Sequence, residues 1–525
     1  MVAAMSRFAK PGCFAIGVVA LVAWSSRGEA APPVTAEPQS ARVVEAEGLA
    51  RLDPGDFDRA KARHLLSRAG FGGTPDEARN LHALGLEGAV DKLVEFRDDA
   101  AWDLPIDVES AFRDGRDPKS VPPEERRRLD QERRKKDAAQ LARLRAWWMQ
   151  RMIASPRPLE EKLTLFWHGH FATEHQVVRD SYALWVQNQM LRTHADDFAA
   201  LLRGIVRDPA MLRYLDNNRN ERRRPNENLA REIMELFSMG EGNYTEQDIR
   251  EAARALTGYT FVREAATFRF AKNKHDEGEK TIFGEKGRYD GDGLVDLILR
   301  QPQTSRFVAA KLFAFFAHDS PSEETIERLS TLVRRHEFRL APVLKNLFMS
   351  AEFYSSRAMG TQVKSPIQLV VGTYRVLGIE EGDFAAGYQA ARNMGQDLFQ
   401  PPNVKGWPGG RDWINSRLVF ARYNSLANLV DPSRRGKRQA EGGFDVIAAV
   451  EARRFANAGE VVDYLAGACL SVPLAESKRQ ALIDYLDNGR PFPASKEWDS
   501  KRDEVNARLR AVLVLMICMP EYQVT

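Results

Sequence analysis

Cysteine is scarce in this 525-residue sequence, which contains only three. Two of them, Cys469 and Cys518, lie beyond the first thirty residues, and two cysteines are too few for a zinc–thiolate cluster. In an oxidising compartment this pair can form a disulfide, whereas a buried free cysteine in an apolar helix is equally ordinary. Both alternatives stay open, because pairing depends on geometry that a sequence does not contain.

An excess of charge and several catalytic motifs are also absent. The formal net charge is only +3, which argues against a surface built as a whole to bind nucleic acid. The sequence has no Gly-Lys-Ser/Thr phosphate loop, Gly-x-Ser-x-Gly elbow, His-Glu-x-x-His helix or dinucleotide-binding fingerprint. Several common enzyme classes are therefore excluded.

Long apolar runs are missing as well. The run from Cys13 to Trp24 is too short to span a bilayer comfortably. It follows Arg7 and Lys10 and precedes the small-residue segment 28–30, an order typical of a secretory signal peptide. We expect cleavage near residue 30, export through the Sec route, a periplasmic or extracellular location and no transmembrane anchor in the cleaved chain.

The residues that are abundant favour a folded, helical protein. Hydrophobic residues make up 43% of the chain and include 27 Phe, enough for sizeable cores. Apolar residues recur mostly at helical spacing, and the period changes only around 268–270 and 280–283. We predict a mainly α, multi-helical globular protein with one small β-hairpin near residues 265–285. The predicted division is a signal peptide (1–30), a flexible leader (31–53), a main helical domain (54–430), a linker (431–443) and a C-terminal helical subdomain packing on the main domain (444–525).

The first candidate site is the segment Phe166–Phe171, which contains His168 and His170. Two residues at positions i and i+2 cannot face one direction on a regular α-helix, although on a distorted turn they can. The two histidines are therefore either metal or acid–base groups, or hydrogen-bonded members of an aromatic cluster.

The second candidate site begins with Asn226 and Asn228 and continues on a predicted helix that carries Arg231, Glu232 and Glu235. Two carboxylates at i and i+3 can bind a hard cation or share acid–base work. The same carboxylates can instead hold Arg231 and the neighbouring loop in a structural network, because asparagines are also good caps and turn formers.

The third candidate is the loop rich in Pro, Gly and Trp that extends to Trp413. Its prolines and glycines favour an ordered loop, and Trp407 and Trp413 offer flat apolar faces. Such faces suit a sugar ring or a partner surface, and they also suit a lid over the protein's own core.

Collinear motifs give these segments a family resemblance. The sequence resembles an exported bacterial family known as domain of unknown function 1800, over roughly residues 57–525. The segments that carry the resemblance are His64–Gly72, Phe166–Phe171, Asn226–Glu232 with its Gly-x-Tyr-Thr and Leu-Thr-Gly continuation, His275–Lys280, Lys364–Pro366 and Pro401–Trp413. The resemblance implies an exported, mainly helical protein. Members are often encoded beside a sulfatase-like exported family, which implies a partner or a shared substrate, but no activity comes with the family.

Two functional hypotheses follow. In the first, the protein is a metal-assisted hydrolase or a related enzyme, with His168, His170 and Glu232 as catalytic groups and these three with Glu235 as ligands of a divalent metal ion. In the second, it is a non-catalytic binding or assembly protein for a cell-envelope polysaccharide or an exported sulfatase-like partner. The candidate binding residues are Asn226, Asn228, Arg231, Trp407 and Trp413. Whether the chain is an enzyme stays open.

Overall fold

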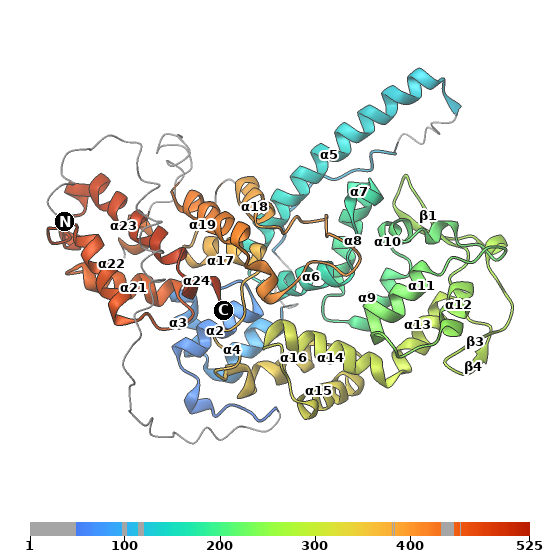
Figure 1. Cartoon of the computed structure of the whole chain (residues 1–525), viewed down its shortest axis with the longest axis horizontal. Coiled ribbons are helices and arrows are strands. Elements are labelled where there is room, and N and C mark those ends of the chain that lie inside the picture. The colour runs from blue at the N-terminus through green and yellow to red at the C-terminus, as the bar shows by residue number, and fades with distance from the viewer. Residues whose placement is uncertain are drawn as a thin grey trace. The chain divides into compact units, whose positions relative to one another are not determined.

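The computed structural model describes residues 49–96, 102–113, 120–380, 382, 384–431, 446–451 and 453–525. Over these residues the chain is mainly α-helical, with two small antiparallel sheets (Figure 1). The predicted fold class is therefore confirmed. The predicted signal peptide, the leader up to residue 48 and the predicted linker beyond residue 431 lie outside the described residues.

Helices follow one another with short connections for most of the chain. The first are α2 (Arg59–Ala69), α3 (Pro75–Ala83), α4 (Gly85–Val94), α5 (Pro123–Ala154), α6 (Pro158–His170), α7 (His175–Val178), α8 (Ser181–Thr193), α9 (Phe198–Ile205) and α10 (Pro209–Tyr214). Next come α11 (Asn228–Glu232), a π-helix (Ile233–Met239), α12 (Glu246–Ala255), α13 (Gly291–Arg300), α14 (Pro302–Phe316), α15 (Glu323–Arg335) and α16 (Ala341–Phe348). The last are α17 (Pro366–Val376), α18 (Phe384–Asn393), α19 (Ser416–Val430), α20 (Val446–Glu451), α21 (Ala458–Cys469), α22 (Glu476–Asp487), α23 (Arg502–Ile517) and α24 (Pro520–Gln523).

The expected single hairpin near residues 265–285 is wrong in its pairing. Strand β2 (Thr267–Phe270) pairs with the preceding β1 (Tyr259–Val262), and β3 (Lys280–Ile282) pairs with the following β4 (Glu285–Gly287). The two segments that were expected to pair with each other therefore belong to separate hairpins. The polar segment between them contains a short helical turn at Lys272–Lys274 rather than a hairpin tip.

The apolar side chains form two large clusters, and α6 contributes to both. The first cluster joins α2–α4 with the helices from α9 to α16, and it includes Leu159 and Leu163 of α6. The second joins α5 and the helices from α17 to α23, and it includes Leu165 of α6. Helix α6 therefore lies at the boundary between the two cores, a kind of location where ligand cavities often form.

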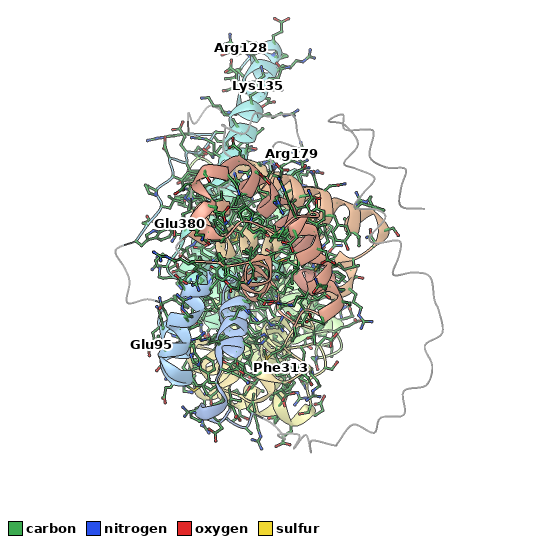
Figure 2. All side chains as sticks on the ribbon, turned by 90° about the vertical axis from the view of Figure 1, so that its left-hand side faces the viewer. Glu95, Arg128, Lys135, Arg179, Phe313 and Glu380 are labelled. Carbon is green, nitrogen blue, oxygen red and sulfur yellow. The ribbon has the colours of Figure 1, made fainter. Side chains whose placement is uncertain are left out.

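Helix α5 differs from the other helices because its N-terminal half is charged and exposed. Its C-terminal half buries Leu144, Trp148 and Met152, whereas Arg128 and Lys135 lie on the part that extends away from the neighbouring helices (Figure 2). Among the described residues, no helix is both long and apolar enough to cross a membrane.

Candidate ligand-binding site

One face of α6 forms a wall of a cavity of about 360 Å³. Lys162, Phe166 and Gly169 lie along this face, because residues four and then three positions apart fall on the same side of a helix. The opposite wall comes from α14, where Lys311 and Phe315 are also four residues apart. The rings of Phe166 and Phe315 are in contact, with centroids 4.7 Å apart.

The Pro/Gly/Trp-rich loop closes another side of the cavity. Its backbone approaches the end of α6 so closely at Gly406, where φ is +81°, that a Cβ there would overlap the carbonyl oxygen of Gly169. The adjacent Trp407 is half-buried, and its ring centroid lies 5.4 Å from that of His168. Trp413 also lines the cavity, and it is buried. The glycine at 406 thus allows a close approach that brings the adjacent Trp407 to the site.

The polar lining supplies mainly hydrogen-bond donors. Ser365 and Gln368 form a capping box that begins α17, so the Gln368 carbonyl oxygen accepts from the Ser365 backbone N–H. The carbonyl oxygen of Gln396 accepts from the backbone N–H of Ile367 at 2.9 Å. Each oxygen thus already has one backbone donor, and the amide NH2 groups can donate to a ligand. Lys405 adds a positive charge at the exposed part of the loop.

The two predicted histidines point to different sides of α6, as their spacing requires. His168 Nε2 accepts a hydrogen bond from the Phe399 backbone N–H at 3.1 Å, and His170 Nε2 donates to the Phe237 carbonyl oxygen at 3.0 Å. Both side chains are buried, and burial lowers the pKa of each to about 3. The charge of Lys311 acts in the same direction on His170. Both imidazoles are therefore neutral, and each has its Nε2 committed to the backbone.

The predicted carboxylates lie on two consecutive elements, Glu232 at the end of α11 and Glu235 in the π-helix that continues it. Glu235 accepts a hydrogen bond from the Tyr244 hydroxyl at 2.9 Å. Glu232 is half-buried, and burial together with the Glu235 charge raises its pKa, while Lys405 and Arg231 oppose that change. Within the part of the chain that the structure describes, no three His, Cys, Asp or Glu residues are grouped closely enough to hold a metal ion. His168, His170, Glu232 and Glu235 are thus not brought together as a ligand cluster.

The asparagines of the second candidate segment organise backbone. Asn226 Oδ1 accepts from the Asn228 N–H at 3.0 Å, and the Asn226 N–H donates to Asn220 Oδ1 at 2.9 Å. Arg231 forms an ion pair with Glu227 at 3.2 Å, and it also binds both oxygens of Glu246 at 2.8 and 2.9 Å. None of Asn226, Asn228 and Arg231 lines the cavity. Their contacts match the structural-network alternative.

The family comparison agrees with the sequence motifs. A family model described as "Protein of unknown function (DUF1800)" matches residues 64–524. The chain belongs to the DUF1800 family. No curated protein and no solved structure matches it. Because the DUF1800 description assigns no activity, the role of the cavity has to be argued from its residues.

In this DUF1800 chain, three of the motif segments meet at the cavity. The segment Phe166–Phe171 contributes Phe166, Gly169 and His170, the segment Lys364–Pro366 contributes Ser365, and the Pro401–Trp413 loop contributes both tryptophans. Segments far apart in sequence therefore converge on one site. Of the predicted site residues, His170, Trp407 and Trp413 line it.

Sequence reasoning missed the lysines and glutamines of this site. Lys162 gave no distinct signal, because it directly follows Glu160 and Glu161, and such a charged run is typical of a solvated helix face. The contributions of α14 and of Gln396 had no local signal, because they depend on contacts between distant segments. Cys469 and Cys518 are not joined by a disulfide in this structure.

The burial of the histidines gives a pH prediction. We expect His168 and His170 to stay neutral in the folded protein from pH 8 down to about pH 4, because the pKa of each is about 3. An unfolded histidine has a pKa of about 6.5, so their contribution to stability is complete above that pH and is lost progressively as the pH falls toward the folded pKa. NMR of the imidazole nitrogens measures this directly, and titration of either ring between pH 5 and 8 would contradict it.

Proposed function

We propose that the protein binds a carbohydrate ring in the cavity between α6, α14 and the Pro401–Trp413 loop. The observation that supports this most directly is the meeting of the two loop tryptophans with Phe166 and Phe315 around one space of about 360 Å³. Aromatic faces pack against the apolar face of a sugar ring, while nearby amide and ammonium donors suit its hydroxyl oxygens. This is the binding hypothesis of the sequence, now with a defined site.

The proposal places catalysis by metal-assisted hydrolysis second. That hypothesis relied on convergence of His168 and His170 with Glu232 and Glu235, and both histidines use Nε2 for backbone hydrogen bonds. The proposal keeps export as its setting, so the natural ligand is a polysaccharide outside the cytoplasm. An exported sulfatase-like partner would then share this ligand and need not contact this chain.

Replacing Trp407 by alanine tests the proposed function. We expect at least about a 10-fold loss of affinity for any polysaccharide that the wild-type protein binds, because truncating a central aromatic contact commonly costs 2 kcal/mol or more. The melting temperature should change little, since Trp407 is only half-buried. Binding is measured by isothermal titration calorimetry against dextran, polygalacturonate and dextran sulfate.

A matched control is available on α8. Trp185 is also half-buried, and it lies outside the cavity, so its replacement by alanine should leave affinity unchanged. The proposal fails if the wild-type chain binds none of these polysaccharides. It also fails if the Trp185 and Trp407 variants lose affinity equally.

A further inference from the structure

Lys162 is the most unusual polar residue of the cavity. Its side chain lines the cavity wall, yet only 1% of the residue is exposed. Among the residues that the structure describes, no acceptor lies within hydrogen-bond reach of its Nζ. An ammonium group has three donors, and leaving them without acceptors in a buried place is costly. A ligand in the cavity can supply what this side chain lacks.

The groups around Lys162 do not neutralise it. Its Nζ lies 4.9 Å from the ring centroid of Phe71 and 5.6 Å from that of Phe315, so the aromatic faces provide its favourable contacts. Burial, together with the positive charges of Arg68 and Lys364, holds the pKa of Lys162 well below its ordinary value.

These two neighbouring cations are themselves bound by neutral acceptors. Arg68 Nε donates to the Phe316 carbonyl oxygen at 2.9 Å, and its other nitrogens donate to the Ala317 carbonyl and the Gln362 amide oxygen. Lys364 Nζ donates to the Tyr522 carbonyl oxygen at 2.8 Å. Both cations beside the cavity therefore donate to uncharged oxygens, and these contacts do not cancel their positive charge.

The rest of the described cavity lining is also positively charged and lacks carboxylates. Lys311 and Lys405 stand at the exposed part of the cavity, and the described lining residues include no Asp or Glu. Glu232, whose raised pKa is partly offset by the Lys405 charge, is outside the lining. Donors without acceptors, together with an excess of positive charge, favour an anionic ligand over a neutral one.

From this arrangement we infer that the ligand is an acidic saccharide, whose carboxylate or sulfate group binds Lys162 while its ring packs on Trp407. Lys311 and Lys405 attract the same charge at the mouth, and the Gln368 and Gln396 amides bind neighbouring oxygens. The inference rests on the proposed function and adds the chemical class of the ligand to it. The Phe315 ring, which contacts Nζ and is only partly buried, is the side chain that has to turn aside.

Binding of an anion beside Lys162 has a consequence for protons. The anion favours the charged ammonium form and so raises the pKa of Lys162. At any pH between the pKa of the free protein and that of the complex, binding takes up a proton. Affinity for an acidic polysaccharide should then increase as the pH falls through this interval.

The test compares three polymers of different charge at physiological salt. The wild-type protein is titrated with dextran, polygalacturonate and dextran sulfate, alongside Lys162→Met, Lys311→Met and, as control, Lys135→Met on the exposed half of α5. We expect Lys162→Met to weaken binding of the acidic polymer at least about 10-fold, Lys311→Met to weaken it less, and Lys135→Met to leave it unchanged. Binding of polygalacturonate alone identifies a carboxylate ligand, and binding of dextran sulfate alone identifies a sulfate ligand.

Stability measurements keep this test interpretable. Lys162→Met should melt no lower than the wild-type protein, because methionine fills a similar volume and removes a buried group without hydrogen-bond partners. If the Lys162 variant does not fold, Lys311→Met still tests the inference, because Lys311 is at an exposed position. Unchanged acidic-polymer affinity in both variants overturns the inference, and so does equal affinity for dextran, although then the proposed carbohydrate function stands. Binding of none of the three polymers overturns both.

Discussion

Replacing Glu161 by glutamine is expected to lower the free energy of unfolding by about 3–5 kcal/mol, the usual cost of breaking a buried ion pair on one side. The Glu161 carboxylate is fully buried on α6 and is not part of the cavity lining. Its oxygens accept from Arg151 Nε at 2.6 Å, from Arg192 Nε at 2.7 Å and from the Trp148 indole at 3.0 Å. A glutamine would remove the charge that both guanidinium groups need, and it would turn a donor toward one of them.

The neighbouring Glu160 provides the control. Burial and the Glu161 charge raise the pKa of Glu160, and its closest ion pair, to Arg157, is 3.4 Å long. We therefore expect Glu160→Gln to change stability by less than about 1 kcal/mol. Urea denaturation of both variants measures the difference. Equal effects would mean that the network does not depend on the Glu161 charge.

The ion pairs of Glu161 also make the stability of the protein depend on pH. The charges of Arg192 and Arg151 outweigh burial and lower the pKa of Glu161. A carboxylate with a lowered folded pKa contributes stability that is present above its unfolded pKa and is lost as the pH falls through the folded value. The Glu161→Gln variant should therefore lose less stability than the wild-type protein in strong acid.

The second large effect is expected from Gly406→Ala. Alanine in a left-handed conformation costs about 1–2 kcal/mol, and its Cβ would overlap the Gly169 carbonyl oxygen. Because that oxygen is part of α6, the loop has to move away and take Trp407 with it. We expect a loss of stability of about 2–4 kcal/mol and loss of polysaccharide binding.

Gly409 is a matched control in the same loop. Its φ of −114° suits any residue, and a Cβ there would meet no atom within 4 Å. Gly409→Ala should therefore keep stability, which is the property compared here because Gly409 itself lines the cavity. Thermal melting of the two variants separates a close contact at residue 406 from a general requirement for loop flexibility. If Gly406→Ala behaves like Gly409→Ala, the described approach of loop and helix is wrong.

Features set by neighbouring residues were predictable from the sequence. Thr74 caps α3 with Glu77, as the Thr-Pro-Asp-Glu segment indicates, and periodicity gave the correct fold class. The pairing of the strands was not predictable from their apolar pattern, because several short segments of similar composition lie between residues 259 and 287. Pairing is decided by the geometry of the turns and by what the strands pack on.

Part of the candidate site was predictable, because some of its residues form unusual local patterns in the sequence. His170 and the loop tryptophans carry unusual local patterns, and they do line the cavity. The asparagine and glutamate segment has a pattern just as dense, yet its contacts go to backbone and to Arg231. Density of polar residues shows that partners are needed, but it does not show whether the partners belong to the protein or to a ligand.

The position of α6 between two cores affects the order in which the chain can fold during synthesis. Leu159 and Leu163 find most of their partners by residue 354, whereas the cluster around Leu165 includes residues beyond 366. The part of this cluster that α17 to α23 form is therefore added only after some two hundred later residues have left the ribosome. Lys162 lines the cavity that Ser365, Gln368 and the later loop complete, and a positive charge there slows the premature association of an apolar helix with other chains.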